Sequence, residues 1–351
     1  MSRYKSVIIG LRGIGAQRPD EADGLPVYGS MPNSHASCYH RCPDTDVVGV
    51  CDLEDVLLAD FKDRWTDVWP DLHLYKDYKE MLDVEKPEIV SVVTGDHLHA
   101  DITVEAASRQ STRAIICEKP IATRLEDADR MIDACEANNV VLSIEHSRRW
   151  HPSYLDAREL IRSGELGELK TIVTDMFSPR AMMFRNGTHL IDMICFFAES
   201  DPAWVTAEIE EGFDHFTEYT GDGGHDPATD PDTAAYIRFR NGVRAFFNCR
   251  KMMFPGSQMY LQCDNGRIEI SDRESVLIHG STPWSWSRQP LVRRSFIHQF
   301  QGAFVPEIVD LLDNGGDPVS PAREARKTLE LMLAILKSHH TGNVRVDFPL
   351  E

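Results

Sequence analysis

The chain has 351 residues, which suggests about two domains on the usual scale of roughly 150 residues each. Lysine and arginine total 37 against 56 aspartates and glutamates, so the formal net charge of −19 disfavours nucleic acid and anionic membrane surfaces as partners. Hydrophobic residues make up 42% of the chain and charged residues 26%, which is typical of a globular protein and argues against disorder.

The sequence has no apolar run near the roughly 18 residues that a membrane-spanning helix needs. The apolar stretch after the basic N-terminus ends at Gly10, which is too short for the core of a signal peptide. Eight cysteines are scattered along the chain and none belongs to a CxxC pair, so neither a disulfide framework nor a zinc ribbon is expected. We therefore expect a cytoplasmic protein.

Short runs rich in Val and Ile alternate with helical patterns in the first half of the chain. The expected strands are 6–9, 47–51, 89–94, 114–117 and 140–144, and the expected helices are 53–65, 100–109 and 125–138. Buried strands that alternate with helices are typical of an α/β fold with a doubly wound parallel sheet. We expect a Rossmann domain over residues 1–122.

The second half has the pattern of an antiparallel sheet. Two Asn-Gly pairs join alternating runs and predict hairpins, 236–240 with 243–249 and 259–263 with 268–271. Further strands are expected at 170–177, 204–210 and 275–279, and helical stripes at 304–312 and 325–336. We expect an α+β domain over residues 123–351, with a C-terminal helix over 321–340 that packs back toward the first domain.

A glycine-rich turn follows the first predicted strand directly. Glycines at this place let the backbone approach a dinucleotide pyrophosphate, and we predict cofactor contacts from Gly10, Arg12, Gly13, Ile14 and Gly15. The pattern departs from GxGxxG because Arg12 stands where the second glycine belongs. Ordinary turn chemistry is therefore the alternative interpretation.

Asp52 ends the second predicted strand. A carboxylate there can accept hydrogen bonds from the adenosine ribose and would repel a 2′-phosphate, which favours NAD over NADP. Asp52 lies 37 residues after Gly15 instead of about 20, so we infer an inserted loop over 17–33. The alternative role for Asp52 is that of an N-cap for the following helix.

Several motifs, in this order along the chain, resemble the Gfo/Idh/MocA family of glucose–fructose oxidoreductase and inositol dehydrogenase. Besides the glycine turn they are Val50-Cys51-Asp52, Thr94-Gly95-Asp96-His97-Leu98-His99, Glu118-Lys119-Pro120 and Gly187-Thr188-His189-Leu190-Ile191-Asp192. The resemblance implies a Rossmann domain followed by an open-faced, largely antiparallel sheet that often forms a subunit interface. It also implies a homo-oligomer, a dimer or a tetramer.

The activity that the resemblance implies is NAD-dependent hydride transfer at a secondary alcohol of a sugar, sugar acid or cyclitol. Two other activities stay open at this point. An enzyme of the same fold can hold NAD tightly and use transient oxidation to permit glycoside cleavage or another lyase-type step. A protein that keeps the fold without turnover can act as a nucleotide sensor.

Carried over to this sequence, the resemblance makes Lys119 and His189 the catalytic residues and adds Thr94, His99 and Glu118 to the cofactor contacts. The chemistry agrees, because oxidation of an alcohol needs a base for the hydroxyl proton and a cation for the alkoxide. The alternatives are a lysine in a surface turn and a histidine packed on a helix. Gly95 stands where the family commonly has proline.

Arg185 occupies the position, four residues before His189, where many family members have an aspartate. Asp192 follows His189 by three residues and could orient the imidazole, or it could be a carboxylate on the helix surface. Arginines near these segments lead us to predict an acidic sugar as substrate, with contacts from Arg149, Arg180, Arg185 and Asp192. The alternative is that these arginines, with Arg148, pair with carboxylates of the chain itself.

Two further groups invite other interpretations. His35, Cys38 and Cys42 share one face of a helix with His40 nearby, but this spacing also suits a helix that faces the core, so we predict no metal site. Trp284 and Trp286 could stack on a sugar ring or could serve packing.

Overall fold

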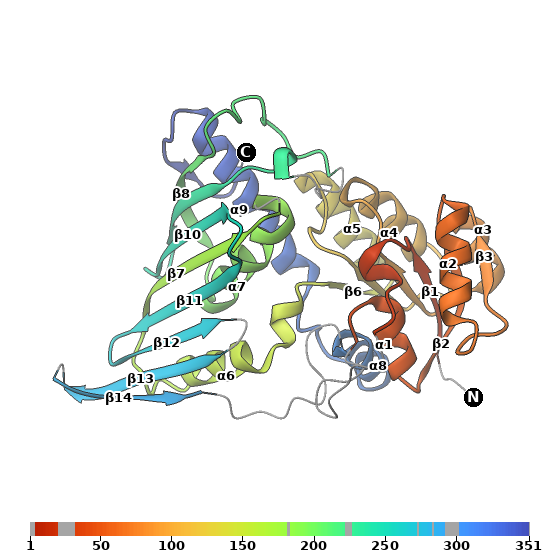
Figure 1. The fold of residues 1–351 in the computed structure, drawn as a ribbon, viewed down its shortest axis with the longest axis horizontal. Helices are drawn as coiled ribbons and strands as arrows, with labels where there is room; N and C mark the ends of the chain where they lie inside the picture. Colours follow the sequence, from red (N-terminus) through yellow and green to blue (C-terminus); the bar gives the residue numbers. More distant parts are fainter. Residues whose placement is uncertain are drawn as a thin grey trace. The chain divides into compact units, whose positions relative to one another are not determined.

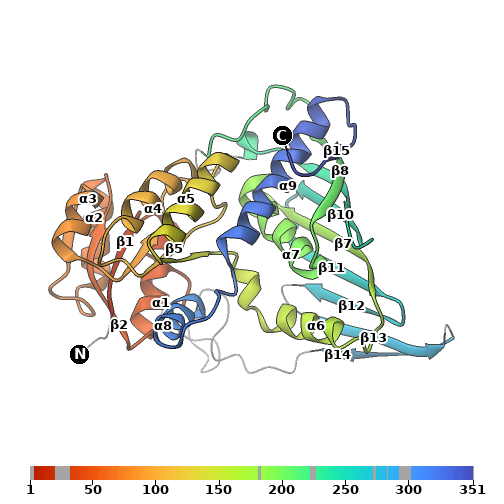
Figure 2. The ribbon, with the colours of Figure 1, turned by 180° about the vertical axis from the view of Figure 1, so that it is seen from behind.

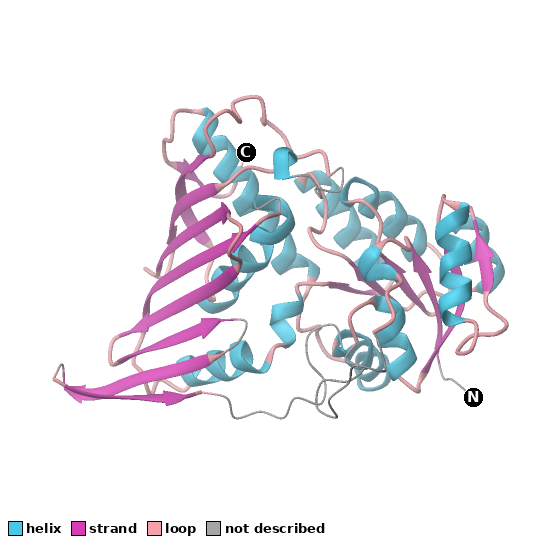
Figure 3. Ribbon diagram, in the orientation of Figure 1, coloured by secondary structure: helices cyan, strands magenta, loops and turns pink. Residues whose placement is uncertain are grey.

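The computed structural model describes residues 4–19, 32–180, 183–221, 227–271, 274–282, 284–291 and 302–350. The chain divides into two compact units (Figures 1 and 3). The first comprises Met1–Ser147 and His298–Arg323, and the second Arg148–Ile297 and Glu324–Glu351.

The first unit is built on a parallel sheet of six strands. The strands are β1 (Tyr4–Ile9), β2 (Thr45–Cys51), β3 (His73–Tyr75), β4 (Ile89–Val92), β5 (Ala114–Cys117) and β6 (Val141–Ile144). Their order is β3-β2-β1-β4-β5-β6, so the direction of winding reverses between β1 and β4. This arrangement confirms the predicted doubly wound sheet.

The described α-helices of the first unit are α1 (His35–Arg41), α2 (Asp55–Trp65), α3 (Tyr78–Glu85), α4 (His99–Ala107), α5 (Leu125–Ala137) and α8 (Phe304–Asn314). Helices α1 and α8 lie side by side although they are far apart in sequence (Figure 2). The ring centroids of His35 and Phe304 are 4.8 Å apart at their contact. The first unit extends past the predicted boundary at 122 because β6 pairs with β5 and α8 packs on α1.

The second unit is built on a sheet of nine strands. They are β7 (Leu169–Ser178), β8 (Pro202–Ile209), β9 (Thr233–Phe239), β10 (Arg244–Lys251), β11 (Gly256–Cys263), β12 (Gly266–Ser271), β13 (Ser275–Thr282), β14 (Ser285–Pro290) and β15 (Val346–Asp347). The order is β14-β13-β12-β11-β7-β10-β9-β8-β15. All neighbours pair antiparallel except β7 and β10, which confirms the largely antiparallel sheet.

Helices α6 (Pro152–Arg162), α7 (Thr188–Ala198) and α9 (Ala322–His340) lie on one side of this sheet (Figure 1). Val205, Ile237 and Phe247 of three neighbouring strands are almost fully buried. Because side chains alternate along a strand, the next residues on these strands point to the opposite face. In the part of the unit that the structure describes, no helix covers that face (Figure 1).

Some predicted features lie partly or wholly outside what the structure describes. Residues 20–31 of the predicted insert are among these. In the described part of the chain, no helix is long and apolar enough to cross a membrane. The described residues also hold no group of three or more His, Cys, Asp or Glu side chains that could bind a metal ion, and Cys38 and Cys42 are buried.

Candidate functional site

The carboxyl edge of the first sheet brings the glycine turn against the end of β4. A Cβ atom at Gly10, where φ is +95°, would lie 2.4 Å from the carbonyl oxygen of Val93. A Cβ atom at Gly15 would lie 2.3 Å from the carbonyl oxygen of Gly10. Both positions therefore require glycine. The turn continues into a short 3₁₀ segment at Gly13–Gly15, and the next helix among the described residues is α1, which begins at His35.

Asp52 ties the end of β2 to the glycine turn. One carboxylate oxygen accepts a hydrogen bond from the Leu11 amide at 2.9 Å, and the other accepts one from the Glu54 amide at 2.9 Å. Glu54, not Asp52, is the N-cap residue of α2. A carboxylate has about four acceptor positions, so Asp52 retains capacity for a ligand hydroxyl. Arg12 pairs with Glu54 on the exposed side of the turn.

His99 connects two loops of the same sheet edge. It is fully buried, with Nδ1 3.0 Å from the Pro120 carbonyl oxygen and Nε2 3.2 Å from the Thr94 carbonyl oxygen. It thus joins the loop after β4 to the loop after β5. Thr94 is half-buried in the first of these loops.

Lys119 follows β5 and is half-buried, next to the buried Glu118. The Lys119 amide donates to Glu118 Oε2 at 3.2 Å, and His35 Nε2 lies 3.4 Å from Glu118 Oε1. On its other side, His35 Nδ1 lies 2.9 Å from Ser91 Oγ, which in turn is 2.8 Å from Tyr39 Oη. Burial alone raises the pKa of Glu118, but the contacts with His35 and Lys119 lower the pKa below its usual value. Glu118 is therefore a buried carboxylate.

In the second unit, His189 is half-buried in the first turn of α7. The preceding π-helical segment, Met183–Gly187, carries Arg185. Asp230 Oδ2 accepts hydrogen bonds from the amides of Phe184 at 2.9 Å and Arg185 at 3.0 Å, which fixes this segment. Burial raises the pKa of Asp230 to about 7, although these backbone amides oppose the shift.

Arg149 and Asp192 form a buried bidentate ion pair. Arg149 Nε donates to Asp192 Oδ2 at 2.8 Å and Nη2 donates to Oδ1 at 2.8 Å, with the two side chains 3% and 0% exposed. Thr328 of α9 also donates to Oδ1, at 3.3 Å. For Arg149 the structure thus shows pairing with a carboxylate of the chain itself. Both carboxylate oxygens of Asp192 accept hydrogen bonds from Arg149. That Arg149 or Asp192 contacts the substrate stays a prediction.

The other predicted substrate contacts differ in their burial. Arg185 is half-buried, whereas Arg180 is exposed after the end of β7. Trp284 and Trp286, on the hairpin of β13 and β14, are 93% and 64% exposed. The structure therefore does not show these two tryptophans packed against the described residues of the unit.

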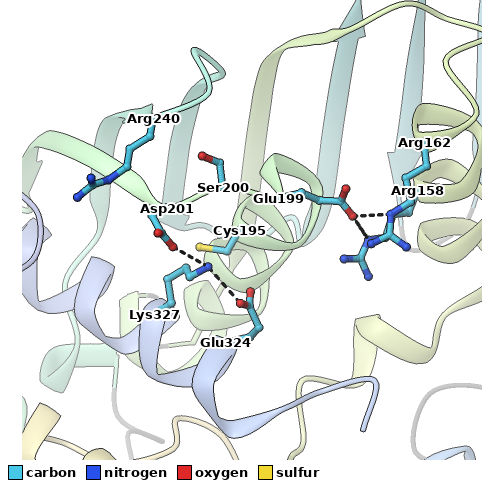
Figure 4. A pocket seen from close by; sticks show the side chains of 9 residues that line it. All are labelled: Arg158, Arg162, Cys195, Glu199, Ser200, Asp201, Arg240, Glu324 and Lys327. Atoms are coloured by element: carbon cyan, nitrogen blue, oxygen red, sulfur yellow. Dashed lines mark hydrogen bonds and ion pairs between the residues drawn. The ribbon is translucent and has the colours of Figure 1, made fainter. Parts of the chain in front are cut away.

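A cleft of about 460 Å³ in the second unit is lined by Cys195 and Glu199 at the C-terminal end of α7 (Figure 4). His189 lies in the first turn of the same helix. The charged side chains of the cleft largely neutralise one another. Glu199 pairs with Arg158 and Arg162, and Lys327 pairs with Asp201 at 3.0 Å and with Glu324 at 3.1 Å. None of the predicted site residues lines this cleft, and we do not assign the active site to it.

Three site residues did not emerge from the sequence. Ser91 lies inside a buried strand, Asp230 follows an irregular segment, and Glu145 follows a predicted strand as a single acidic residue. The partners of Ser91 and Asp230 lie 45 or more residues away along the chain. Of the three, Glu145 alone has a position that indicates a site in the sequence, because it directly follows a predicted strand and the carboxyl ends of parallel strands face the ligand.

Two protein-family models match this chain, one in each half. A profile described as an oxidoreductase family with an NAD-binding Rossmann fold matches residues 28–146. A profile described as the GFO/IDH/MocA C-terminal domain matches residues 154–269. The two matches together span more than half of the chain. The first match begins after the glycine turn, inside the predicted insert.

Relatives with established names are similar over most of their length. D-apiose dehydrogenase of Paraburkholderia graminis is 24% identical over 343 residues, which cover 90% of this chain and 86% of the relative. Myo-inositol 2-dehydrogenase of Thermotoga maritima is 22% identical over 326 residues, which cover 90% of this chain and 95% of the relative. A levoglucosan dehydrogenase solved with NADH and L-sorbose has a TM-score of 0.78 at 17% identity, covering 99% of this chain and 100% of the other. That similarity establishes the fold.

Proposed function

Because the chain belongs to the GFO/IDH/MocA family of dehydrogenases, we propose that it transfers hydride between a nicotinamide cofactor and a secondary alcohol of a sugar, sugar acid or cyclitol. The main support is Lys119, a half-buried lysine at the carboxyl end of β5, which lies between β4 and β6 in the parallel sheet. Ligands of doubly wound sheets bind at this edge, near the point where the winding reverses. The glycine turn and Asp52 lie at the same edge.

NAD is the proposed cofactor in preference to NADP. Gly10, Gly13, Ile14 and Gly15 form the proposed pyrophosphate turn. Asp52 would accept hydrogen bonds from ribose hydroxyls and would repel a 2′-phosphate. Arg12, the one cation in the turn, is paired with Glu54 and so offers little attraction to an additional phosphate.

Thr94, His99, Glu118 and Lys119 complete the proposed cofactor contacts. His99 keeps the loops after β4 and β5 together through two backbone carbonyl groups. Glu118 holds the backbone amide of Lys119. These residues would keep the lysine at a fixed place beside the nicotinamide ring.

Catalysis is assigned to Lys119 and His189. A nicotinamide cofactor held by these residues would supply the acceptor for the hydride of the carbon that bears the hydroxyl group. The Lys119 amine accepts the hydroxyl proton or, as an ammonium group, stabilises the alkoxide. His189 is the second group proposed to exchange a proton with the substrate, because an imidazole can both accept and donate one.

An acidic sugar is the proposed substrate class. Arg185 is half-buried in the π-helical segment directly before α7, four residues before His189, and Arg180 is exposed nearby in sequence. A guanidinium group binds a carboxylate in a bidentate manner. Because Arg149 already pairs with Asp192, the proposal rests mainly on Arg185.

Oxidation of a substrate panel tests this function. The purified protein receives NAD and either neutral polyols and cyclitols or uronates and aldonates, and NADH is followed by absorbance. We expect NADH to accumulate, faster with the acids. Lys119→Met should lower the rate at least a hundredfold, within the range attributed to acid–base catalysis. Lys337→Met, an exposed lysine on α9, should leave the rate unchanged.

Two results would contradict the proposal. Equal rates in the wild type and in Lys119→Met would remove the lysine from the mechanism. Cleavage of a glycoside without net NADH would instead indicate a redox cycle with retained cofactor. Faster turnover of neutral polyols would contradict the acidic substrate class alone.

The open face of the second sheet is the proposed surface for self-association. Trp204, Tyr236 and Phe246 form an aromatic row on it, with ring centroids 5.2 and 5.0 Å apart. Phe246 is 44% exposed. An apolar row of this kind gains stability when a second copy of the sheet covers it.

A further inference from the structure

A second buried carboxyl group, Glu145, lies beside Glu118 at the carboxyl edge of the first sheet. Strands β5 and β6 pair in parallel with Cys117 opposite Ile144, and the Glu145 amide donates to the Cys117 carbonyl oxygen at 2.8 Å. Glu118 and Glu145 are therefore the next residues on two neighbouring strands, which are about 4.8 Å apart in such a sheet. Their side chains start on the same face of the sheet.

Glu145 is only 2% exposed, and neither carboxyl oxygen has a hydrogen-bond partner among the described residues. An isolated carboxylate is strongly disfavoured in such a place. The titratable groups that act on it come from three elements: Cys38 on α1, Glu118 and Lys119 after β5, and Glu307 on α8. His35 of α1 reaches the pair through Glu118.

These surroundings separate the two carboxyl groups. Burial, followed by the negative charges of Glu118 and Glu307, raises the pKa of Glu145 well above its usual value, and Lys119 opposes this only in part. The pKa of Glu118 is lowered because His35 and Lys119 outweigh the effect of burial. Neighbouring acids whose environments differ in this way tend to hold one proton between them.

We propose that Glu118 and Glu145 together hold one proton, so that a single negative charge faces Lys119, and that Glu145 is a positioning residue for this lysine. With one carboxylate instead of two, the ammonium form of Lys119 is stabilised less, and the amine is released at lower pH. The inference rests on the proposed function only for the catalytic role given to Lys119.

The ionisation of the Lys119 amine can be measured without a substrate. The wild type, Glu145→Gln, Glu118→Gln and the double variant are labelled with acetic anhydride over a pH range, and the Lys119 peptide is quantified by mass spectrometry. Glu145→Gln should leave the pH midpoint of labelling unchanged, because glutamine resembles the neutral acid. Glu118→Gln should also leave it nearly unchanged, because Glu145 then ionises and supplies the charge. The double variant should lower the midpoint by about one pH unit or more.

Two labelling results would overturn this account. If Glu145→Gln alone lowers the midpoint by about one unit, both carboxyl groups are ionised in the wild type. If Glu118→Gln lowers it as far as the double variant does, the two groups do not share a proton. Thermal unfolding and NADH titration of each variant show whether it is folded.

Glu118→Gln replaces one of the two oxygens that contact His35 and the Lys119 amide with an NH2 group, so a second measurement uses only Glu145→Gln. The infrared spectrum of the wild type at neutral pH should contain the carbonyl band of a neutral carboxylic acid that Glu145→Gln lacks. A wild-type spectrum that does not differ from the variant in this band would contradict the shared proton. Both measurements stand apart from the substrate panel, so failure of the proposed activity and failure of this inference give different results.

Discussion

At the scale of single residues, burial acts differently on three carboxyl groups. Glu118 remains a carboxylate because His35 and Lys119 contact it. Glu145 has no hydrogen-bond partner among the described residues, and burial raises its pKa well above the usual value. Asp230 accepts backbone hydrogen bonds, yet burial still raises its pKa to about 7. The balance between desolvation and available donors decides the charge of each group.

Asp230→Asn should remove a pH dependence of stability. The pKa of Asp230 rises from 3.8 to about 7 on folding, so the folded state binds this proton more tightly. The resulting stability is fully present below pH 3.8 and is lost as the pH rises through 7. The unfolding free energy of the wild type minus that of the variant should therefore fall by up to about 4 kcal/mol between pH 4 and 8.

Urea unfolding at each pH measures this difference. Asp55→Asn is the matched control, because the Asp55 side chain is 91% exposed and its ion-pair partner is Lys76, so the difference should stay nearly constant. A difference for Asp230→Asn that does not change with pH would show that Asp230 is ionised throughout this range.

Sequence reasoning located residues that belong to compact motifs better than residues with distant partners. The glycine turn and Asp52 are joined in the structure by the bond from the Leu11 amide, although the role of each toward a cofactor stays a prediction. The pair of Arg149 and Asp192 spans 43 positions, and the bond of Asp230 to Arg185 spans 45. Such partners depend on the register of a whole sheet against a helix, which no local pattern contains.

At the scale of elements, α7 is held at its beginning and along its length. Asp230 fixes the segment before it, and Phe184 of that segment stacks on Tyr219 with ring centroids 4.0 Å apart. Asp192, in the second turn, is anchored to Arg149. These contacts fix the helix that carries His189. The buried ion pair is one of them, so breaking it should loosen the helix.

Asp192→Asn should destabilise the second unit strongly. The substitution removes the bidentate counter-charge of the buried Arg149 guanidinium and leaves only the longer contact with Glu324, at 3.9 Å. Breaking a buried ion pair in this way typically costs about 3–5 kcal/mol. Replacing both partners with apolar residues, as in Arg149→Met with Asp192→Leu, should recover much of the loss. Urea unfolding measures the free energies.

The exposed pair of Arg345 and Asp347 provides the control for this prediction. Asp347→Asn should cost less than about 1 kcal/mol, because exposed ion pairs contribute little. Comparable losses for Asp192→Asn and Asp347→Asn would mean that the buried pair does not support the helix.

Long elements with clear periodicity were predicted well, and short or irregular ones were missed. The helices expected at 53–65 and 125–138 correspond to α2 and α5 with shifts of one or two residues. The three-residue strand β3 and the helix α3 were not predicted, because β3 has no buried apolar run. The parallel pairing of β7 with β10 was also missed, since the two strands are joined by no local turn.

At the scale of the whole molecule, the sequence predicts two domains, and the structure divides the chain into two units with different limits. The segment His298–Arg323 returns to the first unit, where α8 packs on α1. A segment that returns to an earlier unit cannot be recognised from composition, because its amphipathic pattern does not identify the surface that it covers.

Phe246→Glu tests the proposed self-association through the open face of the second sheet. A buried charge in the aromatic row would disfavour the contact between copies, so the variant should be monomeric where the wild type is oligomeric. Light scattering after size-exclusion chromatography gives the mass of each. Phe254→Glu is the control, because Phe254 is 83% exposed outside the sheet and should not change the mass. A monomeric wild type would contradict the proposed surface.

The central claim is that a nicotinamide dinucleotide binds at the glycine turn beside Asp52, and titration of the purified protein with NADH and NADPH tests it most directly. Nicotinamide fluorescence should show tighter binding of NADH. Asp52→Asn should weaken NADH binding about tenfold or more, since a hydrogen bond to a charged group contributes about 1.5–3 kcal/mol. Asp55→Asn, with a side chain that is 91% exposed, should bind as the wild type does. Tighter binding of NADPH, or NADH affinity that is unchanged in Asp52→Asn, would contradict this assignment.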